Sequence, residues 1–317
     1  MKNTLIIIGV VAVAGIGAYI WYQSTSVTEV IPDEGPEQII NEEVVTEPVV
    51  EESDNDQATE VEPTATPSRP GEEVIGRSAG GRDIKAYNFG TGPDTVLFVG
   101  GIHGGYAFNT SLLAYELIDY LESNPTLIPE TITVSVVPIL NPDGIERATG
   151  NSGRFTAAAV TTNDNVRVAS RFNANEVDLN RNFDCQWQRE GTWQDRTVSG
   201  GNAAFSEPEA QAIQGFVQTH RPVAVVAWYA AAGEVFASAC GSDAVLPQTT
   251  ALSELYATAS GYTAQPTFEY YTITGDMMDW LARNQIPAIS VLLSDRENTE
   301  WSRNRPAIEA LLNELGS

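Results

Sequence analysis

Residues 95–106 read Thr-Val-Leu-Phe-Val-Gly-Gly-Ile-His-Gly-Gly-Tyr. The first five residues are β-branched, aliphatic or aromatic, which is typical of a buried strand, and the glycines that follow end the strand in a turn. Three more short apolar runs have the same character, Thr131 to Pro138, Val223 to Trp228 and Ala288 to Leu293. We therefore expect the strand before His103 to be one of several buried strands in a sheet.

Segments with helical spacing lie between these runs, namely Asn109 to Glu122, Glu207 to Thr219, Ala251 to Ser260 and Asp276 to Asn284. Ser206 is expected to cap the helix that has Pro208 in its first turn, and Thr274-Gly275-Asp276 offers a similar start for another helix. The alternation predicts a single α/β domain with a mixed, mostly covered β-sheet and helices on both faces. Ligands of such sheets bind at the carboxyl ends of the strands.

The composition narrows the classes of partner. The chain has 317 residues, of which 42 are acidic and 17 are basic, and its formal net charge is -25. A polyanion such as DNA or RNA would be repelled, so nucleic-acid binding is not expected. Two histidines, His103 and His220, and two cysteines are present in all, which limits the metal sites that these side chains can build.

The first 70 residues divide into two segments. Residues 1–22 contain an uncharged stretch, Leu5 to Tyr22, which would be about 27 Å long as a helix. We expect a single-pass membrane anchor there, with a cleavable signal peptide as the alternative. Lys2 before the stretch and thirteen acidic residues after it place the N-terminus in the cytoplasm. Residues 23–70 are rich in Glu, Pro and Thr and are predicted to form an acidic disordered linker.

The remaining segment, residues 71–317, is then an extracytoplasmic domain at the cell membrane, or a secreted one if a signal peptide is cleaved. Cys185 and Cys240 both fall in this domain. Disulfides form and persist outside the cytoplasm, so we expect the two cysteines to be bridged. Two free buried thiols are the alternative, because sequence does not show the distance between them.

Further motifs follow in order: Asn141-Pro142-Asp143-Gly144, Val177-Asp178-Leu179-Asn180-Arg181-Asn182-Phe183, Phe205-Ser206-Glu207-Pro208-Glu209 and Tyr271-Thr272-Ile273-Thr274-Gly275-Asp276. One such turn motif indicates little, but five ordered matches, counting the segment around His103, are specific. From Gly76 to the C-terminus the chain resembles the M14 family of zinc carboxypeptidases. The resemblance implies one M14 carboxypeptidase-like domain over residues 71–317.

The resemblance also implies a zinc site made of two histidines, one glutamate and an open position for water. His103 occupies the position of the first ligand. The glutamate position falls on Ala107 or, with a shorter spacing, on Tyr106, and the second histidine position falls on Tyr229. Two of the three ligands are therefore absent and His103 is a remnant ligand. Zinc is the cofactor of the family, but no cofactor is expected in this chain.

The general base of the family is a glutamate at the end of the last strand. This chain has Leu292 there, or Leu293 if the register shifts by one residue. Without zinc to lower the pKa of a bound water and without a base to accept its proton, peptide hydrolysis has no nucleophile. We therefore expect no functioning catalytic residue in this chain.

The substrate-holding positions of the family are retained. Asn180 and Arg181 match the pair that binds the C-terminal carboxylate of the substrate. Arg171 matches the arginine that polarises the scissile carbonyl, and Tyr271 matches the tyrosine that closes over the substrate. The resemblance therefore implies that this chain still binds a peptide although it has lost the groups that hydrolyse one.

Asp178 matches the residue that orients the first histidine of the family, so we expect a hydrogen bond between Asp178 and His103. In the simpler alternative, Arg171 and Arg181 do not bind a ligand and only neutralise acids such as Asp178 or Asp143.

These observations favour a membrane-anchored, catalytically inactive M14 peptidase-like protein that binds a peptide or a peptidoglycan-type ligand by its C-terminal carboxylate. One alternative is an active zinc metallocarboxypeptidase with a non-standard metal site. In that site, either Glu234 or the phenolate of Tyr229 would bind the metal together with His103. Another is a surface scaffold whose cleft is vestigial. The expected partners are thus a peptide with a free carboxylate and, through the N-terminal helix, the membrane.

Overall fold

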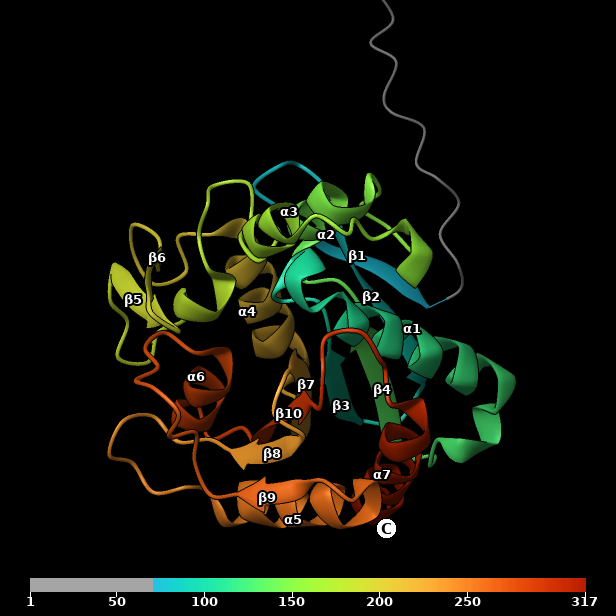
Figure 1. The fold of residues 1–317 in the computed structure, drawn as a ribbon. Helices are drawn as coiled ribbons and strands as arrows, with labels where there is room; N and C mark the ends of the chain where they lie inside the picture. Colours follow the sequence, from blue (N-terminus) through green and yellow to red (C-terminus); the bar gives the residue numbers. More distant parts are fainter. Residues whose placement is uncertain (1–70) are drawn as a thin grey trace, which may run out of the picture. The chain divides into compact units, whose positions relative to one another are not determined.

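The computed structural model describes residues 71–317, which Figure 1 draws in colour. The predicted membrane anchor (residues 1–22) and the predicted linker (residues 23–70) lie outside the described residues and stay predictions. Within residues 71–317, no helix is both long enough and apolar enough to cross a membrane.

An eight-stranded mixed β-sheet forms the centre of the domain. Its strands are β1 (Glu72–Arg77), β2 (Asp83–Gly90), β3 (Asp94–Val99), β4 (Ile132–Val137), β7 (Ala224–Ala230), β8 (Glu234–Ala237), β9 (Thr263–Gln265) and β10 (Ala288–Leu293). They lie in the order β1-β2-β4-β3-β7-β10-β8-β9. The central pairs β4/β3, β3/β7 and β7/β10 are parallel, as is β8/β9. The pairs β1/β2, β2/β4 and β10/β8 are antiparallel.

Helices cover both faces of this sheet (Figure 1). One face is covered by α1 (Phe108–Ser123), α5 (Pro247–Ser260) and α7 (Trp301–Leu315), and the other by α4 (Pro208–His220) and α6 (Met277–Arg283). The smaller elements are α2 (Pro142–Thr149), α3 (Asp164–Ala169), the ribbon β5 (Glu190–Trp193) and β6 (Arg196–Ser199), and the 3-10 turns η1 (Gly104–Ala107), η2 (Pro125–Leu127), η3 (Ala157–Ala159) and η4 (Leu179–Arg181).

The β3 strand shows how the sequence produces this layering. Side chains of a strand alternate between its two faces. Val96 and Phe98 accordingly join the core beneath α1, α5 and α7, whereas Leu97 and Val99 join the core beneath α4 and α6. All four are fully buried or nearly so. A central parallel strand is covered on both faces and therefore has a continuous apolar run, which is why it was recognisable in the sequence.

The predicted fold class is confirmed, and the four predicted strands and four predicted helices are present close to their predicted bounds. The run from Ala288 to Leu293, for example, is β10 with the same two ends. The strands β1, β2, β8 and β9 were not predicted. Two of these are short, since β8 has four residues and β9 has three. β1 has six residues but mixes charged and apolar ones, Glu-Glu-Val-Ile-Gly-Arg, and so lacks the apolar run of a buried strand.

One predicted helix start is wrong and one is confirmed. The N-cap of α4 is Glu207, whose side chain makes no capping hydrogen bond. Ser206 cannot cap this helix because its hydroxyl donates to Glu207 Oε1 and accepts from Asn182 Nδ2. The N-cap of α6 is Asp276, as expected, and its carboxylate accepts from the main-chain N–H groups of Met278 and Asp279.

The parallel pairing brings the ends of β3, β7 and β10 to one edge of the sheet. Leu292 lies directly opposite Tyr229 in the β10/β7 register. It also lies opposite Glu234 in the antiparallel β10/β8 register. The sheet therefore places the second-histidine and general-base positions inferred from the resemblance next to each other.

The predicted disulfide between Cys185 and Cys240 is confirmed, with a Cα–Cα distance of 5.8 Å. It joins the segment after η4 to the segment after β8. Gln186 and Gly241, each next to a bridged cysteine, both line the cleft described below. The disulfide thus ties together two walls of that cleft.

We expect removal of this disulfide to destabilise the domain. The two cysteines are 55 residues apart, and the chain-entropy model gives about 4 kcal/mol for closing such a loop. Cys185→Ser combined with Cys240→Ser should lower the free energy of unfolding by up to about that amount. Denaturant unfolding with and without a reductant measures the loss. The double variant is the control, because a reductant should not change its stability, and an unchanged wild type under reduction would contradict the prediction.

Candidate ligand-binding cleft

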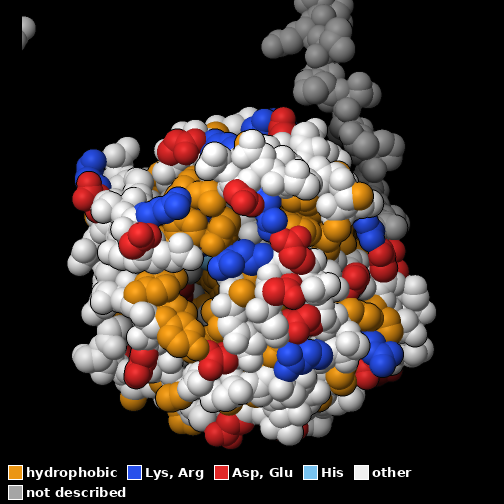
Figure 2. Space-filling view, viewed as in Figure 1, with side chains coloured by type: hydrophobic (Ala, Val, Ile, Leu, Met, Phe, Trp, Pro, Cys, Tyr) orange, Lys and Arg blue, Asp and Glu red, His pale blue; other side chains and the backbone are white. Residues whose placement is uncertain are grey.

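A cleft of about 460 Å³ lies at the carboxyl ends of β3, β7 and β10. His103 enters it from the turn after β3, Tyr229 from the end of β7 and Leu292 from the end of β10. Its other walls come from distant parts of the sequence, including Arg171 and Asn180, Trp193 of β5, residues 267, 268 and 270–273, and Arg296. Figure 2 shows the surface hollowed on this face, with hydrophobic side chains around the hollow and Lys or Arg side chains at its edge.

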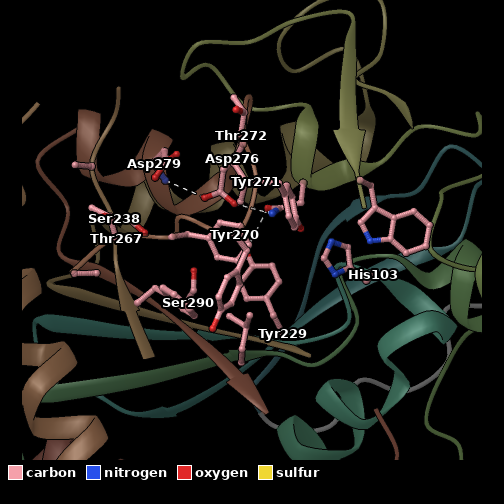
Figure 3. Close-up of a pocket in the computed structure, with 18 of the residues that line it drawn as sticks. His103, Tyr229, Ser238, Thr267, Tyr270, Tyr271, Thr272, Asp276, Asp279 and Ser290 are labelled. Carbon is pink, nitrogen blue, oxygen red and sulfur yellow. Dashed lines mark hydrogen bonds between the residues drawn. The ribbon is translucent and has the colours of Figure 1, made fainter. Parts of the chain in front are cut away.

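His103 is 6% exposed and faces the cleft (Figure 3). Neither ring nitrogen has a hydrogen-bond partner among the described residues. Its Nε2 atom is 3.8 Å from Asp178 Oδ1, which is longer than a hydrogen bond, so the predicted hydrogen bond to Asp178 is absent. Burial, and then the charge of Arg171, hold the pKa of His103 well below its usual value. The imidazole is therefore neutral at physiological pH.

Arg171 takes the hydrogen bonds that were expected for His103. It is 3% exposed, and its Nε and Nη2 atoms lie 2.9 and 2.8 Å from Asp178 Oδ2. Burial alone would raise the pKa of Asp178, but the charges of Arg171 and Arg181 hold it below its usual value. The Arg171 guanidinium also lies 4.4 Å from the centroid of the Trp193 ring. Arg171 thus neutralises Asp178, as the simpler alternative required, and lines the cleft as well.

A chain of hydrogen bonds in the cleft begins at Tyr229, whose ring centroid lies 5.5 Å from that of His103, and ends at Asp276 (Figure 3). The Tyr229 hydroxyl donates to Asn180 Oδ1 at 3.2 Å, and Asn180 Nδ2 donates to Asp276 Oδ2 at 2.6 Å. The main-chain N–H of Met277 also donates to Asn180 Oδ1. Burial, and then the charge of Asp276, raise the pKa of Tyr229 well above its usual value. The Tyr229 side chain is therefore a neutral phenol that holds Asn180 in place.

Asp276 and Asp279 give this part of the cleft an acidic character. Both line the cleft, and Asp279 follows Asp276 by one turn of α6. Burial and the charge of Asp276 raise the pKa of Asp279 to about 8. Burial also raises the pKa of Asp276. The pair therefore retains a proton at neutral pH unless a cation approaches it.

Arg181 lies behind the cleft wall. It is 1% exposed, and its guanidinium donates to the main-chain oxygens of Asn180 and Thr192 at 2.8 and 2.9 Å. It is not among the residues that line the cleft, whereas Tyr271, whose ring centroid is 5.8 Å from the Arg181 Cζ atom, does line it. Gly275 packs closely against the main chain of Arg181. Its φ is +67°, and a Cβ atom at this position would lie 2.3 Å from the main-chain oxygen of Arg181.

The remaining predicted site positions are occupied by groups engaged in packing. Ala107 is buried at the start of α1, and the Tyr106 ring packs edge-on against Trp193 at 4.9 Å. Glu234 accepts hydrogen bonds from Gln265 and from the hydroxyl of Tyr270. His220 ends α4 and stacks on Phe216 at 4.2 Å, away from the cleft lining.

Three residues that line the cleft were not predicted from the sequence, namely Arg296, Asp279 and Trp193. Arg296 lies in the loop that follows β10, so the rule that ligands bind at the carboxyl ends of strands could have drawn attention to it. Asp279 lies one turn into a helix whose start was recognised. Trp193 lies in the β5/β6 ribbon, and no local signal connects that ribbon to the cleft.

A mixed sheet covered by helices, with a cleft where its central parallel strands end, defines a carboxypeptidase-like α/β domain. The family model described as "Zinc carboxypeptidase" matches residues 63–311. The chain therefore belongs to the M14 zinc carboxypeptidase family.

Individual relatives are distant. Carboxypeptidase Z of Rattus norvegicus is 32% identical over 122 residues, which cover 34% of this chain and 17% of the relative. Gamma-D-glutamyl-L-diamino acid endopeptidase 1 of Lysinibacillus sphaericus is 25% identical over 207 residues, covering 59% of this chain and 52% of the relative. The chain thus spans about half or less of these relatives.

Solved structures share the fold. Murein-tripeptide amidase MpaA from Escherichia coli O157 superposes with a TM-score of 0.55 at 22% identity, covering 78% of this chain and 93% of that structure. Thrombin activatable fibrinolysis inhibitor superposes with a TM-score of 0.61 at 16% identity, covering 77% and 67%. Both cover the described domain.

The residues of the cleft do not fit the zinc ion of the family. Zinc takes histidine nitrogens, thiolates and carboxylates. In residues 71–317, no group of three such side chains gathers where it could hold a metal ion. The alternative ligands are engaged elsewhere, since Tyr229 donates to Asn180 and Glu234 accepts from Gln265 and Tyr270.

We expect the purified protein to hold well under one equivalent of zinc after exposure to excess Zn²⁺ and dialysis, because no second or third ligand lies beside His103 among residues 71–317. Elemental analysis per chain measures this content. His103→Ala is the matched variant, and its zinc content should equal that of the wild type. Stoichiometric zinc that disappears in His103→Ala would contradict the prediction.

The raised pKa of Asp279 predicts a pH-dependent stability. The folded protein holds this proton up to about pH 8, whereas an unfolded Asp releases it near about pH 4. Between these values the folded state binds more protons, so the free energy of unfolding falls as pH rises.

Asp279→Asn should reduce this slope, so that the variant gains stability relative to the wild type between about pH 5 and about pH 8. Denaturant unfolding of both proteins across this range measures the difference in their free energies of unfolding. Asp279 is coupled to Asp276 and lies near the charge of Arg181, so the measured titration describes the Asp276/Asp279 pair and not Asp279 alone. The comparison also cancels the contribution of Glu209, whose pKa burial raises to about 7. Parallel pH profiles would show that Asp279 titrates normally.

Proposed function

We propose that the protein is a membrane-anchored, extracytoplasmic M14 peptidase-like pseudoenzyme that binds peptides or peptidoglycan-type ligands ending in a free carboxylate. A contrast within the cleft carries this proposal. The metal and base positions hold Ala107 or Tyr106, Tyr229 and Leu292, whereas the cleft retains a volume of about 460 Å³ and a cationic end formed by Arg171 and Arg296. Clefts of this size are suited to small ligands.

The groups in the cleft support the proposed absence of hydrolysis. Leu292 has no atom that accepts a proton, and it lies beside Tyr229, whose hydroxyl is committed to Asn180. A water molecule there would have neither a base nor a metal to make it nucleophilic. Arg171 remains able to hold a ligand oxygen, because it lines the cleft and is fixed by Asp178.

The charges at the two ends of the cleft favour a zwitterionic terminal residue. Arg171 and Arg296 suit a carboxylate, and Asp276 and Asp279 suit an amino group on the side chain of the same residue. The named substrates of two similar proteins agree with this class, one a γ-D-glutamyl-L-diamino acid peptide and the other a murein tripeptide. We therefore propose a peptide that ends in a diamino acid as the ligand.

The proposed location rests on two features. The uncharged N-terminal stretch is long enough for one membrane-spanning helix. The disulfide between Cys185 and Cys240 is typical of an oxidising compartment outside the cytoplasm. A ligand derived from a cell wall would be present in the same compartment.

We expect N-acetyl-Ala-Ala-Lys with a free carboxylate to bind the full-length protein more tightly than its C-terminal amide. The gap should be about 1.5 to 3 kcal/mol, the range for a hydrogen bond to a charged group, which is a tenfold to hundredfold difference in affinity. Isothermal titration calorimetry measures both affinities, and chromatography of the mixture checks for cleavage. The same peptide ending in norleucine tests the acidic end and should bind more weakly.

Two results would reject the proposal in different ways. Equal affinities for the acid and the amide would indicate a vestigial cleft and a scaffold role. Release of the terminal lysine, abolished by a chelator, would indicate an active metallopeptidase with a non-standard site.

A further inference from the structure

We propose that Arg296, together with Arg171, binds the carboxylate of the ligand at the His103 end of the cleft, in place of Arg181. This inference rests on the proposed function, since it names the residues that would hold the carboxylate. Neither the resemblance nor the motifs of the sequence assign a role to Arg296. Its position and its lack of an acidic partner carry the inference.

The two guanidinium groups share one aromatic neighbour. The Cζ atom of Arg296 lies 4.6 Å from the centroid of the Tyr106 ring, and that of Arg171 lies 5.8 Å from the same centroid. Both residues line the cleft. Contact with a ring face leaves the N–H groups of a guanidinium free for a planar acceptor such as a carboxylate. In Arg171, Nε and Nη2 already contact Asp178, which leaves Nη1 for a ligand.

The charge of Arg171 is offset by Asp178, but that of Arg296 is not offset in the same way. Across residues 71–317, no carboxylate oxygen forms an ion pair with Arg296 within 4.0 Å, and its buried Nε atom has no hydrogen-bond partner. This is unexpected in a segment with 29 acidic and 15 basic residues. A partly buried guanidinium without a counter-ion favours the binding of an anion.

The acidic neighbours of Arg296 in the sequence are turned to other partners. Asp295 accepts hydrogen bonds from the main-chain N–H groups of Glu297 and Asn298. Glu297 pairs with Arg167 at 2.6 Å. The loop is thus arranged so that its two carboxylates do not neutralise Arg296.

The loop that contains Arg296 is also held in place by a residue of α1. Asn109, a fully buried residue of α1, donates from Nδ2 to the main-chain oxygens of Asp295 and Asn298, both at 2.9 Å. These bonds fix the main chain on either side of Arg296. A preorganised guanidinium loses less entropy when it binds a ligand.

His103 supplies an independent observation. It is a polar side chain, 6% exposed, that has no hydrogen-bond partner within the described domain and faces the same end of the cleft. Its ring is close enough to Arg171, Arg181 and Arg296 for their charges to act on it. A neutral imidazole has one N–H donor. A carboxylate oxygen at this end of the cleft would accept a hydrogen bond from it.

Arg181 also lies near a tyrosine ring and also has a buried Nε atom without a hydrogen-bond partner among residues 71–317. It differs from Arg296 in its position and in its other donors. Its Nη1 and Nη2 atoms already donate to main-chain oxygens, and it does not line the cleft. A ligand carboxylate would reach it only if Tyr271, which packs near it, moved aside. The binding of the carboxylate by Arg181 therefore stays a prediction from the sequence. The experiment below compares Arg181 and Arg296 directly.

The experiment measures the affinity gap between N-acetyl-Ala-Ala-Lys and its C-terminal amide in the full-length wild type and four full-length variants. Arg296→Gln should reduce a tenfold or larger gap to about twofold or less, because the charge-assisted bond is lost. Arg296→Lys should retain part of the gap. Lysine keeps the positive charge, but it lacks the two parallel N–H groups with which a guanidinium binds a carboxylate. Arg181→Gln should leave the gap in place. Arg305→Gln removes the same charge from the exposed outer side of α7 and is the matched control.

The outcomes separate this inference from the proposed function. If the wild type shows the gap and Arg296→Gln keeps it, Arg296 does not bind the carboxylate and the inference is overturned while the proposed function stands. Loss of the gap in Arg181→Gln would also overturn it. If the wild type shows no gap, the proposed function itself fails. Should Arg181→Gln not fold, the comparison of Arg296→Gln with Arg305→Gln still decides the role of Arg296.

Discussion

Asp178 is a carboxylate with no exposure to solvent, and the arrangement of the cleft depends on how its charge is accommodated. A buried charge is tolerated only when cations and hydrogen-bond donors surround it. Arg171 approaches it with two nitrogen atoms, and the main-chain N–H of Asn180 donates to its other oxygen. Its own main-chain N–H donates to Ser199 at the end of β6. One buried charge thus fixes an arginine in the cleft, the turn that carries Asn180, and the ribbon beside them.

The occupants of the metal and base positions are consistent with a cleft that has no dication to neutralise acidic ligands. Carboxylates at these positions would be desolvated without a partner. Ala107 and Leu292 introduce no charge, and Tyr229 introduces a hydroxyl that has its own acceptor on Asn180. The remaining charges lie at the two ends of the cleft, with arginines near His103 and aspartates on α6. A separation of this kind favours a ligand that carries both charges.

The architecture was predictable because its central elements have local signatures. The strands β3, β4, β7 and β10 are short apolar runs, and α6 begins at an aspartate that caps it. The disulfide followed from the inferred compartment and from there being two cysteines. The edge strands were not predictable in the same way, because a half-exposed strand such as β1 mixes charged and apolar residues.

The candidate site was predictable only in part. The sequence by itself determined which residue types stand at the ends of the central strands, because strand ends and turn motifs are local features of the chain. Only the tertiary structure decided which of these side chains meet. Arg171 rather than His103 bonds Asp178, Arg181 turns to main-chain oxygens, and Arg296 enters the cleft from a loop held by Asn109. The contact of Asn109 with Asp295 joins residues 186 apart, so no spacing within a single segment encodes it. Arg171 and Asp178 are only seven residues apart, but which side chain reaches the buried carboxylate is decided by the packing around it.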